Sequence, residues 1–231
     1  MLPIRRHIAA LFLLLATAAA AQQPRSTILL DPAHGGPDPG AHLPNNVLEK
    51  DVALAFAARL RATLSSANFA VIATRDTDPG VAFPPDQRAG IANHARPAAC
   101  ILIHATDSGN GVHVIASALP ASGPQRVIPW DTAQSASISQ SRSLSTELDA
   151  ALTRARLPVL LTRAYTRPLD NLTCPAIAIE IAPLDNSSPT PTPVTDAAYQ
   201  QRIADTVAQA IIAWRSQPAA SPAIENTGAA Q

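Results

Sequence analysis

Short apolar runs alternate with longer stretches of helical periodicity along the chain. Each run ends in a turn sequence or a polar residue, which is typical of buried strands. The runs predict six strands, at residues 26–33, 69–76, 99–105, 111–119, 158–164 and 175–183. After the first run, apolar side chains recur every four residues, as on the buried face of an amphipathic helix: Leu48, Val52, Phe56, Leu60 and Leu64.

Three further helices are predicted from the same kind of pattern. Residues 84–95 form a short helix with Pro85 in its first turn, and residues 130–156 form a long helix with leucines on one face. Thr195 or Asp196 caps a last helix near the end of the chain. Strands that alternate with helices predict an α/β three-layer sandwich, in which a twisted, mostly parallel sheet of about six strands carries helices on both faces.

The two ends of the chain depart from this pattern. Arg5 and Arg6 precede an apolar run that ends in small residues, which predicts a signal peptide over residues 1–21. No later stretch is apolar over the length of a membrane span, so we expect no integral membrane segment after signal removal. Residues 217–231 have few apolar side chains to bury and are expected to be a disordered tail, which leaves one domain over residues 26–216.

Composition narrows the class of partner. The chain has 17 basic and 17 acidic residues, so it lacks the excess of positive charge that is typical of nucleic-acid-binding proteins. With 47% hydrophobic residues the chain can form a packed core, and its two cysteines are too few for a disulfide framework. Cys100 and Cys174 each begin a predicted strand, and the sequence leaves open whether they pair.

Polar residues at the ends of the predicted strands are the first candidates for chemistry, because ligands bind at the carboxyl ends of strands in open α/β sheets. These residues are His34, Asp76, His104 and Glu180. His34 precedes a Gly-Gly pair and is either a metal ligand or a turn histidine bonded to the backbone. His104 ends an apolar strand and is either a ligand or a histidine at the edge of the core.

Two acidic residues also have two interpretations each. Asn46 followed three residues later by Glu49 predicts a capping box, although a helix start near His34 also suits a third metal ligand. Glu180 stands in the apolar strand sequence IAIEIAP, where a carboxylate is costly unless it is paired or functional. An ion pair with an arginine is the structural alternative for Glu180. Together, His34, Glu49 and His104 form a two-histidine, one-carboxylate set that suits catalytic zinc.

Several motifs resemble those of the zinc-dependent N-acetylmuramoyl-L-alanine amidases, which are bacterial cell-wall hydrolases. The similar segments are DPAHGGPDPGA (31–41), NNVLEKDVALAFAARL (45–60), ILIHAT (101–106) and CPAIAIEIAPLDN (174–186). They follow one another in the family's order between about residues 26 and 216. The chain departs from the family at Ala33, where glycine is usual, at Thr106, where asparagine is frequent, and at Ala182–Pro183, where Gly-Phe is usual.

This resemblance implies both a site and a substrate. Zn²⁺ would be held by His34, Glu49 and His104, and Glu180 would be a catalytic acid that does not bind the metal. The implied reaction cleaves the amide bond between N-acetylmuramic acid and L-alanine in peptidoglycan, which requires a periplasmic or extracellular location and agrees with the signal peptide. We expect a monomer. The alternative functions are a non-catalytic peptidoglycan- or zinc-binding relative and a zinc carboxypeptidase that acts on stem peptides.

Further polar and aromatic residues have both a structural and a functional interpretation. His42, His94 and His113 are interpreted as spare histidines, with His42 near enough to the proposed ligands in sequence to contact substrate. Asp31 and Asp38 flank His34, and either could accept a hydrogen bond from its imidazole. Trp130 could stack on a sugar or pack against the fold.

Overall fold

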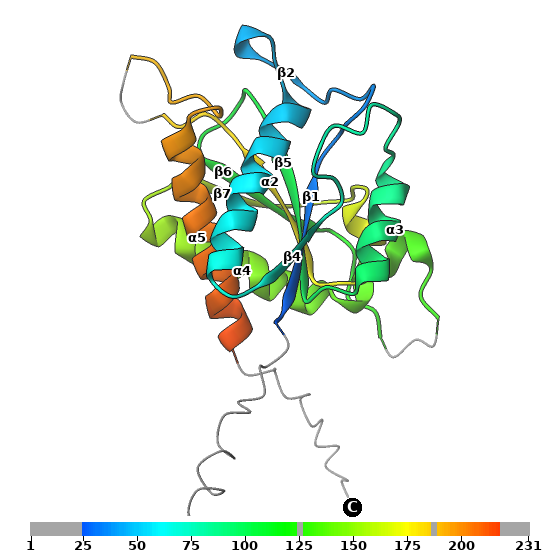
Figure 1. Cartoon of the computed structure of the whole chain (residues 1–231). Coiled ribbons are helices and arrows are strands. Elements are labelled where there is room, and N and C mark those ends of the chain that lie inside the picture. Colours follow the sequence, from blue (N-terminus) through cyan, green and yellow to red (C-terminus); the bar gives the residue numbers. More distant parts are fainter. Residues whose placement is uncertain (1–24, 124–126, 186–188, 218–231) are drawn as a thin grey trace, which may run out of the picture.

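A six-stranded sheet forms the centre of the computed structural model, which describes residues 25–123, 127–185 and 189–217 (Figure 1). The predicted signal peptide and residues 218–231 of the predicted tail lie outside the described residues. In spatial order the strands are β4 (Ala70–Ala73), β1 (Thr27–Pro32), β5 (Ala99–Ala105), β8 (Ala176–Ile181), β6 (Val112–Ser117) and β7 (Val159–Ala164). The first four are mutually parallel, β6 runs antiparallel to β8, and β7 is parallel to β6, so the prediction of a mostly parallel sheet is confirmed.

Helices cover both faces of this sheet. One face packs against α2 (Glu49–Ser66), α4 (Ile138–Arg154) and α5 (Ala197–Ser216). The other face packs against the shorter α3 (Pro85–Ala95) and the 3-10 turn η4 (Leu169–Asn171), which lie on the opposite side of the sheet from α2 in Figure 1. Alternate strand residues therefore enter two separate cores, as the strand period of two requires. None of the helices in the described part of the chain combines the length and apolar character that a membrane crossing needs.

The predicted helix over residues 130–156 is wrong in one respect, because it is broken into the 3-10 segment η3 (Trp130–Ala136) and α4. The Gln134 side chain donates hydrogen bonds to the carbonyls of Leu172 and Cys174, at 2.8 and 2.9 Å. These bonds hold η3 against the segment that precedes β8. A continuous α-helix would carry Gln134 away from those carbonyls.

Cys100 and Cys174 form a disulfide, which answers the question that the sequence leaves open. The bond joins the start of β5 to the segment leading into β8, and both residues are buried. It therefore ties together the two strands that carry His104 and Glu180.

Candidate metal centre

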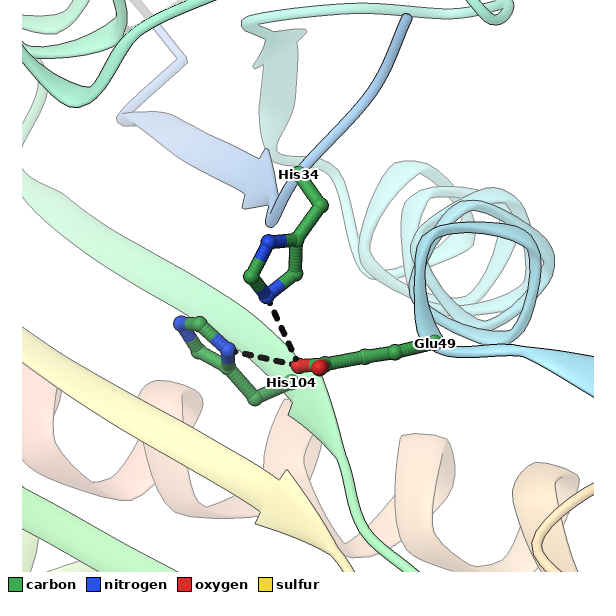
Figure 2. A group of neighbouring side chains, drawn as sticks. All are labelled: His34, Glu49 and His104. Carbon is green, nitrogen blue, oxygen red and sulfur yellow. Dashed lines mark hydrogen bonds and ion pairs between the residues drawn. The ribbon is translucent and has the colours of Figure 1, made fainter. Parts of the chain in front are cut away.

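Three side chains from three separate elements meet beyond the carboxyl ends of β1 and β5. His34 follows β1, Glu49 is the first residue of α2, and His104 is the last residue but one of β5. Figure 2 shows both imidazoles turned toward the carboxylate: His34 Nε2 lies 3.2 Å and His104 Nδ1 lies 2.8 Å from Glu49 Oε1. One ligand atom from each residue lies within 4.8 Å of the others. The structure thus brings together the three residues that the sequence predicts as metal ligands.

The loop after β1 orients the His34 ring. His34 has a φ of 64°, and the next residue, Gly35, pairs through its backbone with Asp38. Asp38 Oδ2 lies 2.9 Å from His34 Nδ1, which leaves Nε2 directed at Glu49. Of the two aspartates considered from the sequence, Asp38 is therefore the one that supports the imidazole. Asp31 forms a buried ion pair with Arg88 instead, at 2.7 Å.

Glu49 is not part of a capping box, so that interpretation of the sequence is wrong. Asn46 has a φ of 59°, and the following β3 (Val47–Leu48) is extended because it pairs with β2 (His42–Leu43). The helix consequently begins at Glu49 itself, without a side-chain cap. Glu49 Oε2 instead accepts a hydrogen bond from the Ala41 amide at 2.8 Å, and Oε1 remains for the histidines.

Gly40 closes the loop over two of the three residues. Its φ is +66°, and a Cβ at this position would lie 2.6 Å from both His34 Cδ2 and Glu49 Oε2. The backbone therefore approaches the cluster more closely than any side chain would permit. This close approach leaves the cluster little room to spread.

The electrostatics favour an ionised carboxylate at the centre of the cluster. Burial raises the pKa of Glu49, but hydrogen bonds from His104, His34 and the Ala41 amide together outweigh burial and hold that pKa well below its usual range. The hydrogen bond to Glu49 is also the main reason why the pKa of His34 is raised, against the opposing effect of burial. A deprotonated carboxylate is the form that a metal requires.

The donor set and its spacing fit a zinc ion. Ligand atoms held at 2.0–2.1 Å from one tetrahedral ion lie about 3.3 Å apart, which is near the 2.8 and 3.2 Å separations between Glu49 Oε1 and the two imidazole nitrogens. Two histidines and one carboxylate are also the protein ligands of many catalytic zinc sites, in which a fourth position stays open for water. His34 and His104 side chains are 22% and 26% exposed, so the cluster is reachable from solvent.

Glu180 lies in a row of polar side chains that crosses the sheet beside this cluster. It pairs in register with His104 on β5 and with His113 on β6. Residues in register on neighbouring strands point to the same face, here the face of α3. The partner of Glu180 is His113, whose Nδ1 lies 2.7 Å from Glu180 Oε2, rather than the arginine considered from the sequence.

The site therefore includes a residue that the sequence interpretation missed. The sequence pattern alone groups His113 with the spare histidines, but in the structure it occupies the same row as His104 and Glu180. The signal was present in GVHV, where a histidine alternates with buried valines, but its partner lies 67 residues away.

Two other candidates from the sequence lie in different contacts. Asp76, a predicted strand-end candidate, pairs with Arg61 at 2.5 Å. Trp130 is 56% exposed and has the Arg167 guanidinium 5.2 Å from its ring centroid.

The chain matches one protein family over most of its length. The family described as N-acetylmuramoyl-L-alanine amidase matches residues 28–213. Over 97 residues the chain is 34% identical to the N-acetylmuramoyl-L-alanine amidase AmiC of Neisseria meningitidis serogroup B, covering 39% of this chain and 23% of that protein. It is 38% identical over 91 residues to the germination-specific N-acetylmuramoyl-L-alanine amidase of Bacillus subtilis, covering 33% of this chain and 37% of that protein. These matches thus span less than two fifths of either relative.

Solved structures share the fold. The N-acetylmuramoyl-L-alanine amidase AmiC2 of Nostoc punctiforme superposes with a TM-score of 0.62 at 22% identity, covering 83% of this chain and 98% of that one. The amidase Ami1 from Mycobacterium smegmatis gives a TM-score of 0.65 at 20% identity, covering 82% and 96%. At such identities the likeness establishes the architecture, and it confirms the predicted α/β sandwich.

Proposed function

Because the chain belongs to the N-acetylmuramoyl-L-alanine amidase family, we propose that it is a zinc-dependent hydrolase of peptidoglycan. The bond cleaved is the amide between N-acetylmuramic acid and the L-alanine that begins the stem peptide. The observation that carries this proposal is the convergence of His34, Glu49 and His104, with Glu180 in register with His104 on the neighbouring strand. A metal site and an adjacent proton carrier are the two parts that this hydrolysis requires.

The ligand atoms of the proposed zinc site are His34 Nε2, Glu49 Oε1 and His104 Nδ1. When bound, zinc supplies Lewis-acid polarisation of the scissile carbonyl and lowers the pKa of a coordinated water. Asp38 fixes the orientation of the His34 ring through Nδ1, and the Ala41 amide fixes Glu49 through Oε2. Both contacts reduce the reorganisation that metal binding would otherwise demand.

Glu180 is the proposed general base and then general acid. Its side chain is 31% exposed and stands in register with His104, one strand away from the ligand set. It takes the proton of the attacking water and delivers it to the nitrogen of the leaving L-alanine. The water oxygen bonds to the carbonyl carbon as the carbon–nitrogen bond breaks, so atoms and charge balance over the reaction.

We also propose a cellular location for the protein and the bounds of its catalytic domain. Peptidoglycan lies outside the cytoplasm, so the substrate agrees with export by a signal peptide over residues 1–21 to the periplasm or the extracellular space. Residues 26–216 form the proposed catalytic domain, and residues 217–231 the disordered tail. We propose that the protein acts as a monomer with peptidoglycan or muropeptides as its partner.

Metal analysis of purified mature protein combined with dye release from labelled peptidoglycan tests this proposal. We expect about one zinc per chain, with zinc lost in His34→Ala and His104→Ala variants that keep their fold. Glu180→Gln should retain zinc yet lose dye release by at least about 100-fold, because it removes the proton carrier without touching a ligand. Dye release by Glu180→Gln at the wild-type rate would contradict its assigned role.

A non-catalytic peptidoglycan- or zinc-binding relative is the second candidate. It is favoured by Thr106 and by Ala182–Pro183, which depart from the residues usual in the family beside His104 and Glu180. That candidate predicts zinc binding and sedimentation with peptidoglycan, but no dye release at any protein concentration.

A further inference from the structure

We propose that His113 is a positioning residue that holds Glu180 in its working orientation. This inference rests on the proposed function, because it gives Glu180 the role of proton carrier. It adds a fifth residue to the site and extends the site across the sheet to β6.

The direct contact is short and comes from a partly buried ring. His113 Nδ1 lies 2.7 Å from Glu180 Oε2, and the two side chains are 14% and 31% exposed. A glutamate on a strand has several side-chain rotamers, and a hydrogen bond from a fixed ring selects one of them. Because the bond uses Oε2, we assign the proton transfer to the other oxygen, Oε1.

The sheet register aims this contact at the metal site. Glu180 pairs with His104 on one side and with His113 on the other, so three polar side chains form one row on one face. His104 belongs to the ligand cluster, whereas His113 is separated from it by the Glu180 strand. Glu180 therefore stands between a proposed ligand and the residue that holds it.

The loop that joins β5 to β6 packs against the His113 ring through Gly109. A Cβ at Gly109 would lie 2.5 Å from both His113 Cε1 and Nε2, so the ring edge fills the space that a side chain would need. Gly109 has a φ of +89°, which favours glycine. The far side of the ring, which bears Nε2, is thus confined by backbone while Nδ1 is directed at Glu180.

The end of that loop is anchored to the core. Gly111 donates to the Pro183 carbonyl at 3.0 Å and accepts from the Ala182 amide at 2.9 Å. The buried Tyr199 hydroxyl of α5 lies 3.0 Å from the Gly111 carbonyl and 2.9 Å from that of Ala182. The loop that confines His113 is therefore joined by hydrogen bonds to the segment that follows Glu180, so both partners are tied to the same part of the fold.

The alternative is that His113 only fills space at the edge of the core. The two roles differ in how strongly activity depends on the position of the hydrogen-bond donor at residue 113. An asparagine at 113 places an amide N–H close to where Nδ1 lies, whereas a glutamine places its amide near the position of Nε2, away from Glu180. A space-filling role makes the two substitutions equivalent, and a positioning role does not.

The test compares His113→Ala, His113→Asn and His113→Gln in the zinc-loaded mature chain, with kcat and KM measured on solubilised peptidoglycan. We expect His113→Ala and His113→Gln to lose about 10- to 100-fold in kcat with little change in KM and zinc content. His113→Asn should recover most of that loss. The same change at an exposed site, His94→Ala, is the control and should match the wild type.

A spectroscopic readout tests the contact independently of turnover. In protein labelled with ¹⁵N-histidine, the His113 signal, assigned by its loss in His113→Asn, should show a proton on Nδ1 and should shift in Glu180→Gln. Equal kcat in folded His113→Asn and His113→Gln, or a His113 signal indifferent to Glu180→Gln, would overturn the inference. A wild-type protein without zinc-dependent amidase activity would overturn the proposed function instead, and the spectrum would still decide whether His113 holds Glu180.

Discussion

At the scale of single residues, Glu49 uses its two carboxylate oxygens for different purposes. Oε2 accepts from the Ala41 amide, which fixes the side chain to the loop, and Oε1 faces both imidazoles. His34 is fixed in a similar way by Asp38. His34 and Glu49 thus each direct one atom at the cluster, while a second atom of each forms a hydrogen bond with the loop after β1.

Gly40→Ala should damage the proposed site without disturbing the remainder of the fold. A Cβ at Gly40 would lie 2.6 Å from atoms of His34 and Glu49, so the ligands must move apart. We expect zinc affinity to fall by at least about tenfold, measured by competition with a chromophoric chelator.

Gly80→Ala is the matched control for this change. Gly80 has a φ of +68°, close to the +66° of Gly40, but its Cβ would meet nothing within 4 Å. Both substitutions carry the same backbone strain, so only the clash separates them. Equal zinc affinities in the two variants would show that Gly40 does not shape the site.

Asp78 should give the folded protein a stability that depends on pH. The hydrogen bond from Lys50, at 2.6 Å, and the Gly36 amide lower the pKa of Asp78 to about 2, from an ordinary value of 3.8. Because the folded-state pKa is the lower one, this stabilisation is present above pH 3.8 and is lost as pH falls toward 2. Urea unfolding of wild type and Asp78→Asn should therefore differ at pH 6 and converge near pH 2. A difference that stays constant over that range would contradict the assignment.

At the scale of elements, α5 connects the outer helical layer to the loops around the site. Asp196 caps α5 by accepting from the Tyr199 amide at 2.7 Å, as the sequence predicts for one of its two candidates. The first turn of α5 then brings the Tyr199 hydroxyl to the carbonyls of Gly111 and Ala182. Burial of this hydroxyl raises the pKa of Tyr199 well above its usual range, so it remains a donor at every physiological pH.

Tyr199→Phe should lower the free energy of unfolding by about 1–2 kcal/mol, because it removes a buried donor from two carbonyl acceptors. Urea denaturation followed by circular dichroism measures the change. Tyr165→Phe is the control, since Tyr165 is 71% exposed and should change stability by less than about 0.5 kcal/mol. A Tyr199→Phe protein as stable as Tyr165→Phe would show that the anchor contributes nothing.

Local patterns predicted most elements, because strand and helix periods are properties of neighbouring residues. The apolar run over residues 99–105 corresponds to β5, and four of the five residues of the helical stripe, from Val52 to Leu64, lie in α2. The fifth, Leu48, lies in β3. Features that depend on distant contacts were missed or wrong. Gln134 breaks a predicted helix by bonding carbonyls about 40 residues away. The β2–β3 pairing is too short to show a period in the sequence. It keeps the residues after Asn46 extended, so the helix begins at Glu49 and Asn46 is not its cap.

The same distinction applies to the candidate site. His34, His104 and Glu180 could be proposed because each follows or ends an apolar run at one edge of a parallel sheet. Their convergence follows from topology. The pairing of His113 with Glu180 could not be proposed, because it requires β6 to lie antiparallel beside β8, and the sequence pattern does not give strand order.

At the scale of the whole molecule, the Cys100–Cys174 disulfide closes a loop of 74 residues that includes β6, α4 and β7. Cross-links of this span stabilise mainly by restricting the unfolded chain, typically by about 2–4 kcal/mol. A bond of this kind persists in an oxidising compartment, which agrees with the proposed export.

Removal of this disulfide should destabilise the protein by about 2–4 kcal/mol without altering zinc content. The comparison is between the wild type and the Cys100→Ala/Cys174→Ala double variant in urea denaturation, each with and without reductant. Reductant should weaken the wild type and leave the double variant unchanged. A wild type insensitive to reductant under unfolding conditions would show that the two cysteines do not pair.

Mass analysis of the products released from purified peptidoglycan by the mature, zinc-loaded protein tests the proposed cleavage of the amide bond between N-acetylmuramic acid and L-alanine. The proposed amidase activity should release complete stem peptides that begin with a free L-alanine amino group, leaving glycan strands with intact lactyl groups. Chelation of zinc and Glu180→Gln should each abolish these products. Release of single terminal amino acids from stem peptides still attached to the glycan, or no release at all, would contradict the proposed amidase activity.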